Sequence, residues 1–251
     1  LDIDNVNITN NTGDAIRVSA GASAKVDIDV ATVKNNAGDG LTVVAVTSSE
    51  IKITHAEFDT NAKGITVNAN NGTSSIKLVD VDIKNSTDKV NGKAISSTST
   101  GNATISVTTT EANPNRNALN NNAGGIFVVA GDANHTDSTA TVTVRDTDIN
   151  NNTGSALNIR STGTANIDVD ITNQEAHNQF TNNSSAEGVV VIKAGYAGNE
   201  VVNAEAQATV SIKNTDFDTN GEAGSQGNGI DVASIAKATV TIENVNINKA
   251  K

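Results

Sequence analysis

The feature that most constrains the fold of this chain is an internal repeat that runs through its 251 residues. Each copy combines alternating apolar residues with an asparagine and a glycine; in the first copy these are Leu1, Ile3, Val6, Ile8, Asn11, Gly13, Ala15, Ile16 and Val18. Successive copies begin at residues 1, 26, 51, 76, 105, 142, 167, 210 and 240. Four of the eight spacings are 25 residues, and the longer ones, 29, 37, 43 and 30, indicate the same unit with inserted loops. A fixed period of this size is typical of solenoids, in which each unit stacks on its neighbours.

The spacing inside one copy predicts the shape of the unit. Apolar pairs lie at offsets 0 and 2, 5 and 7, and 15 and 17, and each pair has the two-residue period of a strand. The phase breaks between pairs, so the chain must turn there. Strands this short are unstable alone but form parallel sheets when copies stack. We therefore predict an all-β fold, a right-handed single-stranded parallel β-helix with three parallel sheets and eight to nine coils of about 25 residues. A β-sandwich is the alternative, but the constant period argues against it.

Composition supports a narrow aliphatic core and excludes several functions. The chain has four Phe, one Tyr and no Trp, Met or Cys, so β-branched aliphatic residues must fill the interior. The lack of cysteine removes disulfides, thiolate metal sites and thiol catalysis. The net charge of −11 disfavours nucleic acid and anionic membranes as partners. No apolar stretch is long enough for direct membrane insertion.

Polar residues recur at one corner of the repeat. An asparagine follows the second apolar pair by three residues in seven copies, at Asn11, Asn36, Asn61, Asn122, Asn152, Asn183 and Asn220. Stacked amides can hydrogen-bond to one another, so this column predicts an asparagine ladder. The glycines that follow are expected to supply positive φ where the chain turns.

Short sequence motifs within the repeat resemble those of a known superfamily. Three copies carry F-x-x-N, beginning at Phe58, Phe180 and Phe217, and Gly124-Gly125-Ile126 approximates its companion word. The chain resembles the right-handed parallel β-helix (pectate-lyase-like) superfamily over essentially its whole length. Within it, the chain is most similar to bacterial autotransporter passenger and adhesin domains, and F-x-x-N is an element of polymorphic outer-membrane proteins. This resemblance implies secretion to the extracellular space or bacterial cell surface, and an adhesive role.

The sequence lacks the residue clusters on which enzymes of this fold depend. Asn214-Thr215-Asp216 matches the first word of polygalacturonases, but the paired aspartates, Gly-His-Gly and Arg-x-Lys are missing. The three histidines, His55, His135 and His177, have no metal-ligand spacing. We therefore expect no catalytic residues and no enzymatic activity.

Calcium is the one cofactor that the pattern leaves open. Stacking in register would place Asp2 beside Asp27 and Asp4 beside Asp29. Facing like charges are destabilising, and a hard cation would relieve them. The alternative interpretation is that these aspartates are ordinary solvated residues on the outer strand face.

Insertions in the fifth and seventh copies mark a candidate binding surface. They fall near 111–118, 131–139, 172–179 and 194–208, at matching corners two copies apart. Function concentrates in loops on a rigid scaffold, so we predict a contact surface for a glycan or protein. Its predicted members are Arg116, Asp132, His177, Tyr196 and Glu200. The alternative is that the insertions have no function.

These features favour a structural or adhesive stalk or passenger segment of a bacterial surface or secreted protein. We expect residues 1–251 to form a single domain within a longer surface protein, because both ends lie inside the repeat. Its partners would be a glycan, a surface protein of a host or neighbouring cell, or further copies of itself. The competing hypotheses are a polysaccharide lyase or hydrolase, including a tailspike-like glycan-binding protein, and a self-assembling surface-array or matrix protein.

Overall fold

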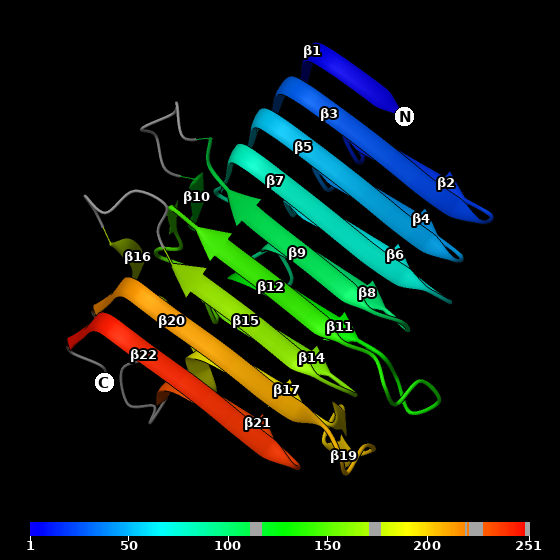
Figure 1. Ribbon diagram of the computed structural model, residues 1–251. Coiled ribbons are helices and arrows are strands. Elements are labelled where there is room, and N and C mark those ends of the chain that lie inside the picture. The colour runs from blue at the N-terminus through cyan, green and yellow to red at the C-terminus, as the bar shows by residue number, and fades with distance from the viewer. Residues whose placement is uncertain (111–116, 171–176, 219, 221–227, 249–251) are drawn as a thin grey trace.

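The computed structural model describes residues 1–110, 117–170, 177–218, 220 and 228–248. These residues form strands and turns, with no helix among them. The strands run side by side in one stack, and the two termini lie at opposite ends of it (Figure 1). The architecture is therefore all-β and built from parallel sheets, and it is consistent with a β-helix.

The larger parallel sheet has twelve strands within the described residues. Nine of them form its main run: β1 (Asp2–Thr9), β3 (Ser23–Lys34), β5 (Ser48–Asp59), β7 (Thr73–Lys84), β9 (Ala103–Thr108), β12 (Ala140–Arg145), β15 (Ala165–Asp170), β20 (Gln207–Asp218) and β22 (Lys237–Asn248). Three short strands continue individual repeats beyond a bend: β10 (Asn117–Asn120), β13 (Thr147–Asp148) and β16 (Asn178–Thr181).

The second parallel sheet takes one strand from each of the first eight repeats. Its eight strands are β2 (Ile16–Ala20), β4 (Leu41–Ala45), β6 (Ile65–Ala69), β8 (Lys93–Ser99), β11 (Gly124–Ala130), β14 (Leu157–Ser161), β17 (Gly188–Ala194) and β21 (Asn228–Ser234). A small antiparallel hairpin, β18 (Tyr196–Ala197) and β19 (Glu200–Val201), lies outside both sheets.

Strand pairing follows the register that the repeat predicts. Val26 pairs with Ile51, and Ile51 pairs with Ile76. The longer repeats keep the same phase. The first residue of each pairs with the first residue of the next, in the order Ile76, Ile105, Val142, Ile167, Val210 and Val240. The insertions therefore leave the stacked strands in register, and the predicted repeat boundaries are confirmed.

In six of the nine repeats the first two predicted strands are joined into one; in the fifth, sixth and seventh repeats they are separate strands, β9 and β10, β12 and β13, and β15 and β16. In β3, β5 and β7 the chain runs through both, bending at a residue with positive φ: Val30 (48°), His55 (50°) and Asp80 (55°). Hydrogen bonding continues on both sides of this bend, so the two segments belong to one sheet. The expectation of three separate parallel sheets is not confirmed; the described residues form two large ones.

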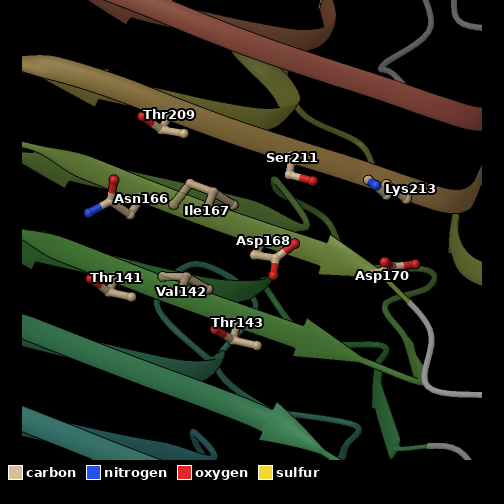
Figure 2. A pocket seen from close by; sticks show the side chains of 10 residues that line it. All are labelled: Thr141, Val142, Thr143, Asn166, Ile167, Asp168, Asp170, Thr209, Ser211 and Lys213. Atoms are coloured by element: carbon tan, nitrogen blue, oxygen red, sulfur yellow. The ribbon is translucent and has the colours of Figure 1, made fainter.

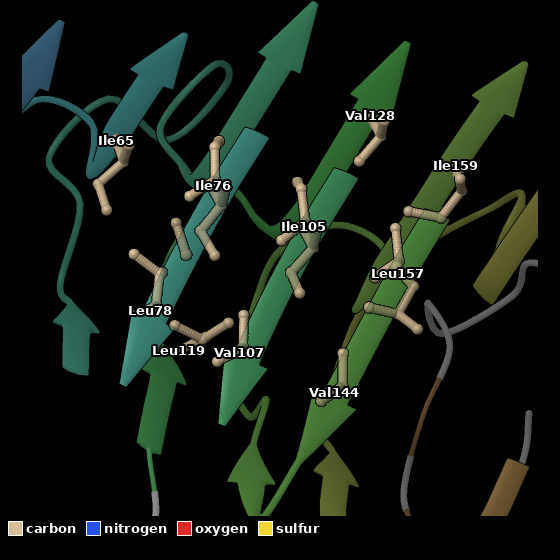
Figure 3. Packing of buried hydrophobic residues seen from close by; sticks show 14 of the residues in the cluster. Ile65, Ile76, Leu78, Ile105, Val107, Leu119, Val128, Val144, Leu157 and Ile159 are labelled. Carbon is tan, nitrogen blue, oxygen red and sulfur yellow. The ribbon is translucent and has the colours of Figure 1, made fainter. Parts of the chain in front are cut away.

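The core lies between the two sheets and is almost entirely aliphatic. Figure 3 shows Ile76, Leu78 and Ile105 packing inward between the strands, and each is essentially inaccessible to solvent. Two core phenylalanines, Phe180 and Phe217, pack edge to face with their ring centroids 5.4 Å apart. One layer of β-branched side chains fills the space, as the composition predicts.

Six of the seven predicted ladder asparagines are buried, and Asn11, in the first repeat, is exposed. The Nδ2 group of Asn36 donates to Oδ1 of Asn61 at 2.8 Å, and that of Asn152 donates to Oδ1 of Asn183 at 2.9 Å. Each ladder amide also serves the backbone: Asn152 Oδ1 accepts from the Asn122 N–H at 2.8 Å, and its Nδ2 donates to the Leu119 carbonyl at 3.0 Å. The ladder thus satisfies main-chain groups that the turn would otherwise leave buried without partners.

Two features of the polar columns were missing from the sequence prediction. Ser86 occupies the ladder position between Asn61 and Asn122, and its hydroxyl donates to Asn122 Oδ1 at 2.7 Å. A second buried polar column lies one strand earlier, at Asn117, Thr147, Asn178 and Thr215. Within it, Asn178 Oδ1 accepts from the Thr147 N–H at 2.9 Å. The repeat pattern allows threonine at this position, as at Thr147, but it did not predict the asparagines or a hydrogen-bonded column there.

Among the described corner glycines, the expected positive φ is found only at Gly188 (144°). Positive φ at this corner belongs to the residue before the ladder asparagine, as at Asn35 (55°), Asn121 (60°) and Asn151 (57°). Gly64 and Gly125 do not have positive φ. Instead, a Cβ at either position would collide with a carbonyl oxygen of the next repeat. Close stacking of the repeats, rather than backbone handedness, requires glycine there.

Removing one ladder amide should destabilise the fold strongly. Asn152→Ala leaves the Asn122 N–H and the Leu119 carbonyl buried without their partner. We expect a loss of about 3 kcal/mol in the free energy of unfolding, measured by urea denaturation. The control is Asn166→Ala, at an exposed position of β15, with an expected change within about 0.5 kcal/mol. Equal losses for the two variants would contradict the structural role of the ladder.

A second substitution should stabilise the protein. Val30 adopts a left-handed conformation that is unfavourable for a β-branched residue, and 47% of it is exposed. Asparagine tolerates this region, so Val30→Asn should raise the free energy of unfolding by about 1 kcal/mol. Val44→Asn, in the regular strand β4, is the control and should bring no gain. Stabilisation by Val44→Asn alone would show that strain at Val30 is unimportant.

Candidate functional site

Two of the insertions arise at the same corner of the fold. Ala130 and Ala194, the last residues of β11 and β17, both pair with Ser161 of the strand between them. Each insertion then opens with a glycine of positive φ, Gly131 (87°) and Gly195 (92°). The predicted match between the two insertions is therefore confirmed here, and only one repeat separates them.

The first insertion is a compact turn held by Asp132. Asp132 Oδ1 accepts from the Asn134 N–H at 2.8 Å and contacts His135 Nδ1, also at 2.8 Å. The hydrogen bond with His135, followed by that with the Asn134 N–H, lowers the pKa of Asp132 below its usual range. The His135 carbonyl in turn accepts from the Thr162 hydroxyl at 2.6 Å, which fixes the turn to the intervening repeat.

The second insertion contains the β18–β19 hairpin. Tyr196 pairs with Val201, and Ala197 pairs with Glu200. The Val202 N–H donates to the Gly195 carbonyl at 2.9 Å and closes the base of the hairpin. Strand β19 of the hairpin is open to solvent: Glu200 is exposed, and 59% of Val201 is accessible to solvent.

Direct hydrogen bonds join the two insertions into one surface. Asn203 Nδ2 donates to the Thr136 carbonyl at 2.8 Å and to Asp137 Oδ1 at 3.0 Å. We call the joined surface, residues 131–138 and 195–205, the loop ledge. It projects at one side of the stack, where β19 and the loop after β11 lie near each other in Figure 1.

The structure brings together three of the five predicted contact residues. Asp132, Tyr196 and Glu200 all belong to the loop ledge. His177 lies near the opposite end of β20, where it contacts Asp216 rather than the ledge. Arg116 lies outside the described residues. Sequence spacing placed the insertions correctly but did not show that they lie at two different corners.

His177 takes part in a separate polar cluster. Its Nδ1 lies 2.8 Å from Asp216 Oδ1, and its Nε2 accepts from Asn244 Nδ2 at 3.1 Å. Partial burial raises the pKa of Asp216, but hydrogen bonds from His177, Gln179 and Asn246 outweigh it, so the pKa is lowered overall. Both ring nitrogens are therefore engaged, and the cluster links β16, β20 and β22.

The four aspartates predicted to bind calcium are neighbours, as the register of the repeats predicts. Asp2 pairs with Asp27, and Asp4 pairs with Asp29. Basic side chains of the next repeat lie beside Asp27 and Asp29. Lys52 Nζ is 3.5 Å from Asp27, and His55 Nδ1 is 3.0 Å from Asp29. Across the described part of the chain, no group of three or more histidine or acidic side chains is arranged to hold a metal. Calcium at these residues stays a prediction.

A shallow groove crosses the outer face of the larger sheet (Figure 2). Its volume is about 440 Å³, and it is lined by Thr141, Val142, Thr143, Asn166, Ile167, Asp168, Asp170, Thr209, Ser211 and Lys213. Arg145 pairs with Asp168 at its edge, and Lys213 pairs with Glu243 at 2.9 Å. The groove thus combines two acids with basic side chains, a cluster that sequence spacing alone did not reveal.

Comparison with known proteins gives no family assignment. No family model, curated protein or solved structure matches the chain. The described residues contain no helix that is long and apolar enough to cross a membrane. The class that the structure defines is thus an all-β protein of stacked parallel strands that carries a structured loop ledge.

The bridge between the two insertions can be tested directly. Asn203→Ala removes both hydrogen bonds that join them. We expect faster amide hydrogen exchange in residues 195–205, with unchanged exchange in strand β14. Asn199→Ala, in the same hairpin, is the control because that side chain is exposed. Unchanged exchange in the Asn203 variant would show that the insertions are ordered independently.

Proposed function

We propose that this chain is a right-handed parallel β-helix segment of a bacterial cell-surface or secreted protein, and that it acts as a rigid stalk that presents an adhesive surface. The observation that carries the proposal is the loop ledge. Two insertions, separated in sequence, meet on an otherwise uniform scaffold and are joined by Asn203. The bridge holds the two insertions in a fixed relative position, as a contact surface requires.

The physical character of the scaffold supports a stalk. Continuous hydrogen bonding between repeats and a narrow dry core resist bending, so a contact surface is held at a fixed orientation. The net charge of −11 favours solubility and disfavours binding to anionic membranes. The ledge offers an aromatic ring at Tyr196 and, paired with it, an exposed apolar side chain at Val201, which are typical of protein and glycan contacts.

A second candidate is polysaccharide cleavage, and the groove on the larger sheet is the observation that favours it. Asp168 and Asp170 face the same groove as Lys213, with Arg145 beside Asp168. Carboxylates near basic side chains are the groups that acid–base cleavage of a glycan requires. We rank it second because both basic residues are already paired with acids, Arg145 with Asp168 and Lys213 with Glu243.

The adhesive role is tested by location and by binding. Immunoblots of cell fractions should find the native protein at the cell surface or in the medium. Beads coated with the protein should bind a glycan array or bacterial cells, and Tyr196→Ala with Glu200→Ala should reduce bead binding at least tenfold. Glu50→Ala, at an exposed strand position, is the control and should bind normally.

Two outcomes would contradict this role. One is a native protein confined to the cytoplasm, and the other is full binding by the ledge variant. Release of reducing ends from polygalacturonate, abolished by Asp168→Asn, would instead support the enzymatic candidate.

A further inference from the structure

An asparagine followed by glycine is chemically labile, because the main-chain nitrogen of the glycine can approach the side-chain amide without obstruction from a side chain of its own. The sequence contains four such pairs, which begin at Asn71, Asn91, Asn220 and Asn228. Asn220 is a buried member of the ladder, and Asn228 lies in strand β21. Asn71 and Asn91 are both exposed at turns, so the structure allows a direct comparison of these two.

The corner that contains Asn71 is longer than the equivalent corner of the preceding repeat. Strand β4 pairs with β6, and β5 pairs with β7, in register on both sides of the corner. Residues 46–47 connect β4 to β5, whereas residues 70–72 connect β6 to β7. An extra residue between paired strands leaves a main-chain group without its partner.

The group left without a partner is the main-chain N–H of Gly72. The N–H groups on either side of it are both bonded to the second repeat. Asn71 donates to the Val46 carbonyl at 2.7 Å, and Thr73 donates to the Thr47 carbonyl at 3.0 Å. Among the described residues, none accepts a hydrogen bond from the Gly72 N–H. The nitrogen is therefore free to react with the neighbouring side chain.

Stacking of the repeats also requires glycine at position 72. A Cβ there would collide with the Thr47 carbonyl oxygen of the second repeat. The Gly72 carbonyl in turn accepts from the Gly101 N–H of the fourth repeat at 2.8 Å. The fold thus places the residue that makes Asn71 most reactive directly after it.

Asn91 forms the same dipeptide in a protected setting. Gly92 is buried, and its N–H donates to the Asp88 carbonyl at 2.8 Å. The Asn91 N–H donates to Asp88 Oδ1 at 2.9 Å, which fixes the turn from its other side. The Gly92 nitrogen can attack only after this turn opens locally, and such opening costs free energy.

From this contrast we propose that Asn71 is a site of spontaneous covalent modification in the folded protein, at which its side-chain amide becomes a carboxylate. The Gly72 nitrogen loses its proton to solvent and bonds to Cγ of Asn71. The Cγ–Nδ2 bond then breaks, and ammonia leaves with a proton taken from solvent. Water opens the resulting cyclic imide at either carbonyl, which yields aspartate or isoaspartate. Water is the only co-reactant, and the reaction does not depend on the proposed adhesive function.

Formation of isoaspartate loosens the stack at this corner. Isoaspartate carries the main chain through its Cβ and Cγ, so it adds an extra carbon to the backbone before Gly72. The hydrogen bonds from Asn71 to Val46 and from Gly101 to Gly72 depend on the original backbone length. Both products also add a negative charge to a chain whose net charge is already −11.

The experiment is a time course of the folded protein in mildly alkaline buffer, followed by peptide mapping with mass spectrometry. Asn71 should react at least about tenfold faster than Asn91, because the Gly92 N–H must first give up a hydrogen bond. In denaturing urea the two rates should converge, since both dipeptides then lose their structure. The proposal is overturned if Asn71 reacts no faster than Asn91 in the folded protein.

Matched variants separate this site from the other asparagines. Asn71→Gln lengthens the side chain and should stop the fast formation of acidic protein, whereas Asn70→Gln, at the exposed neighbouring position, should leave it unchanged. After incubation, amide hydrogen exchange at Gly101 should be faster in the wild type but not in Asn71→Gln. Acidic forms that accumulate at the wild-type rate in Asn71→Gln would refute the site, and unchanged exchange at Gly101 in the modified protein would refute the loosening.

Discussion

The stacking of each repeat on the next, in strict register, is the constraint on which the rest of the structure depends. The buried asparagine ladder enforces it, because most of its amides bond both to the amide of the adjoining repeat and to main-chain groups at the turn, while Asn122 bonds to Ser86. A shift of one residue would break every one of these bonds and would also turn the aliphatic side chains out of the core. Polar and apolar interactions therefore select the same register.

Because the strands fix the register, length can vary only at the corners. The fifth and seventh repeats carry long insertions, yet Ile105, Val142, Ile167 and Val210 remain paired in order. The insertions inherit the geometry of the scaffold, which is why two of them meet at Asn203. Surfaces on the sheets arise differently, from outward residues of adjacent strands such as Thr143, Asp168 and Ser211, which line the groove. A stacked fold thus offers two independent kinds of contact surface.

The sequence predicted much of this, and its failures have specific causes. It missed Asn117 and Asn178 in the second polar column, since insertions precede both and obscure their place in the repeat. It assigned positive φ to the glycines, whereas Asn35 and Asn121 adopt it, because asparagine also tolerates the left-handed region. It grouped His177 with the ledge residues, because spacing along a chain does not show at which corner a loop emerges.

By itself, the sequence determined the repeat, the strand phase, the composition of the core and the position of the ladder. All of these depend on local periodicity, which a chain displays in one dimension. Only the tertiary structure decided that two strands of most repeats merge into one bent strand, that Asn203 joins two insertions, and that Arg145 lies beside Asp168. These features depend on contacts between residues that are distant in sequence. The geometry of side chains across stacked repeats determines such contacts, and the sequence pattern does not show it.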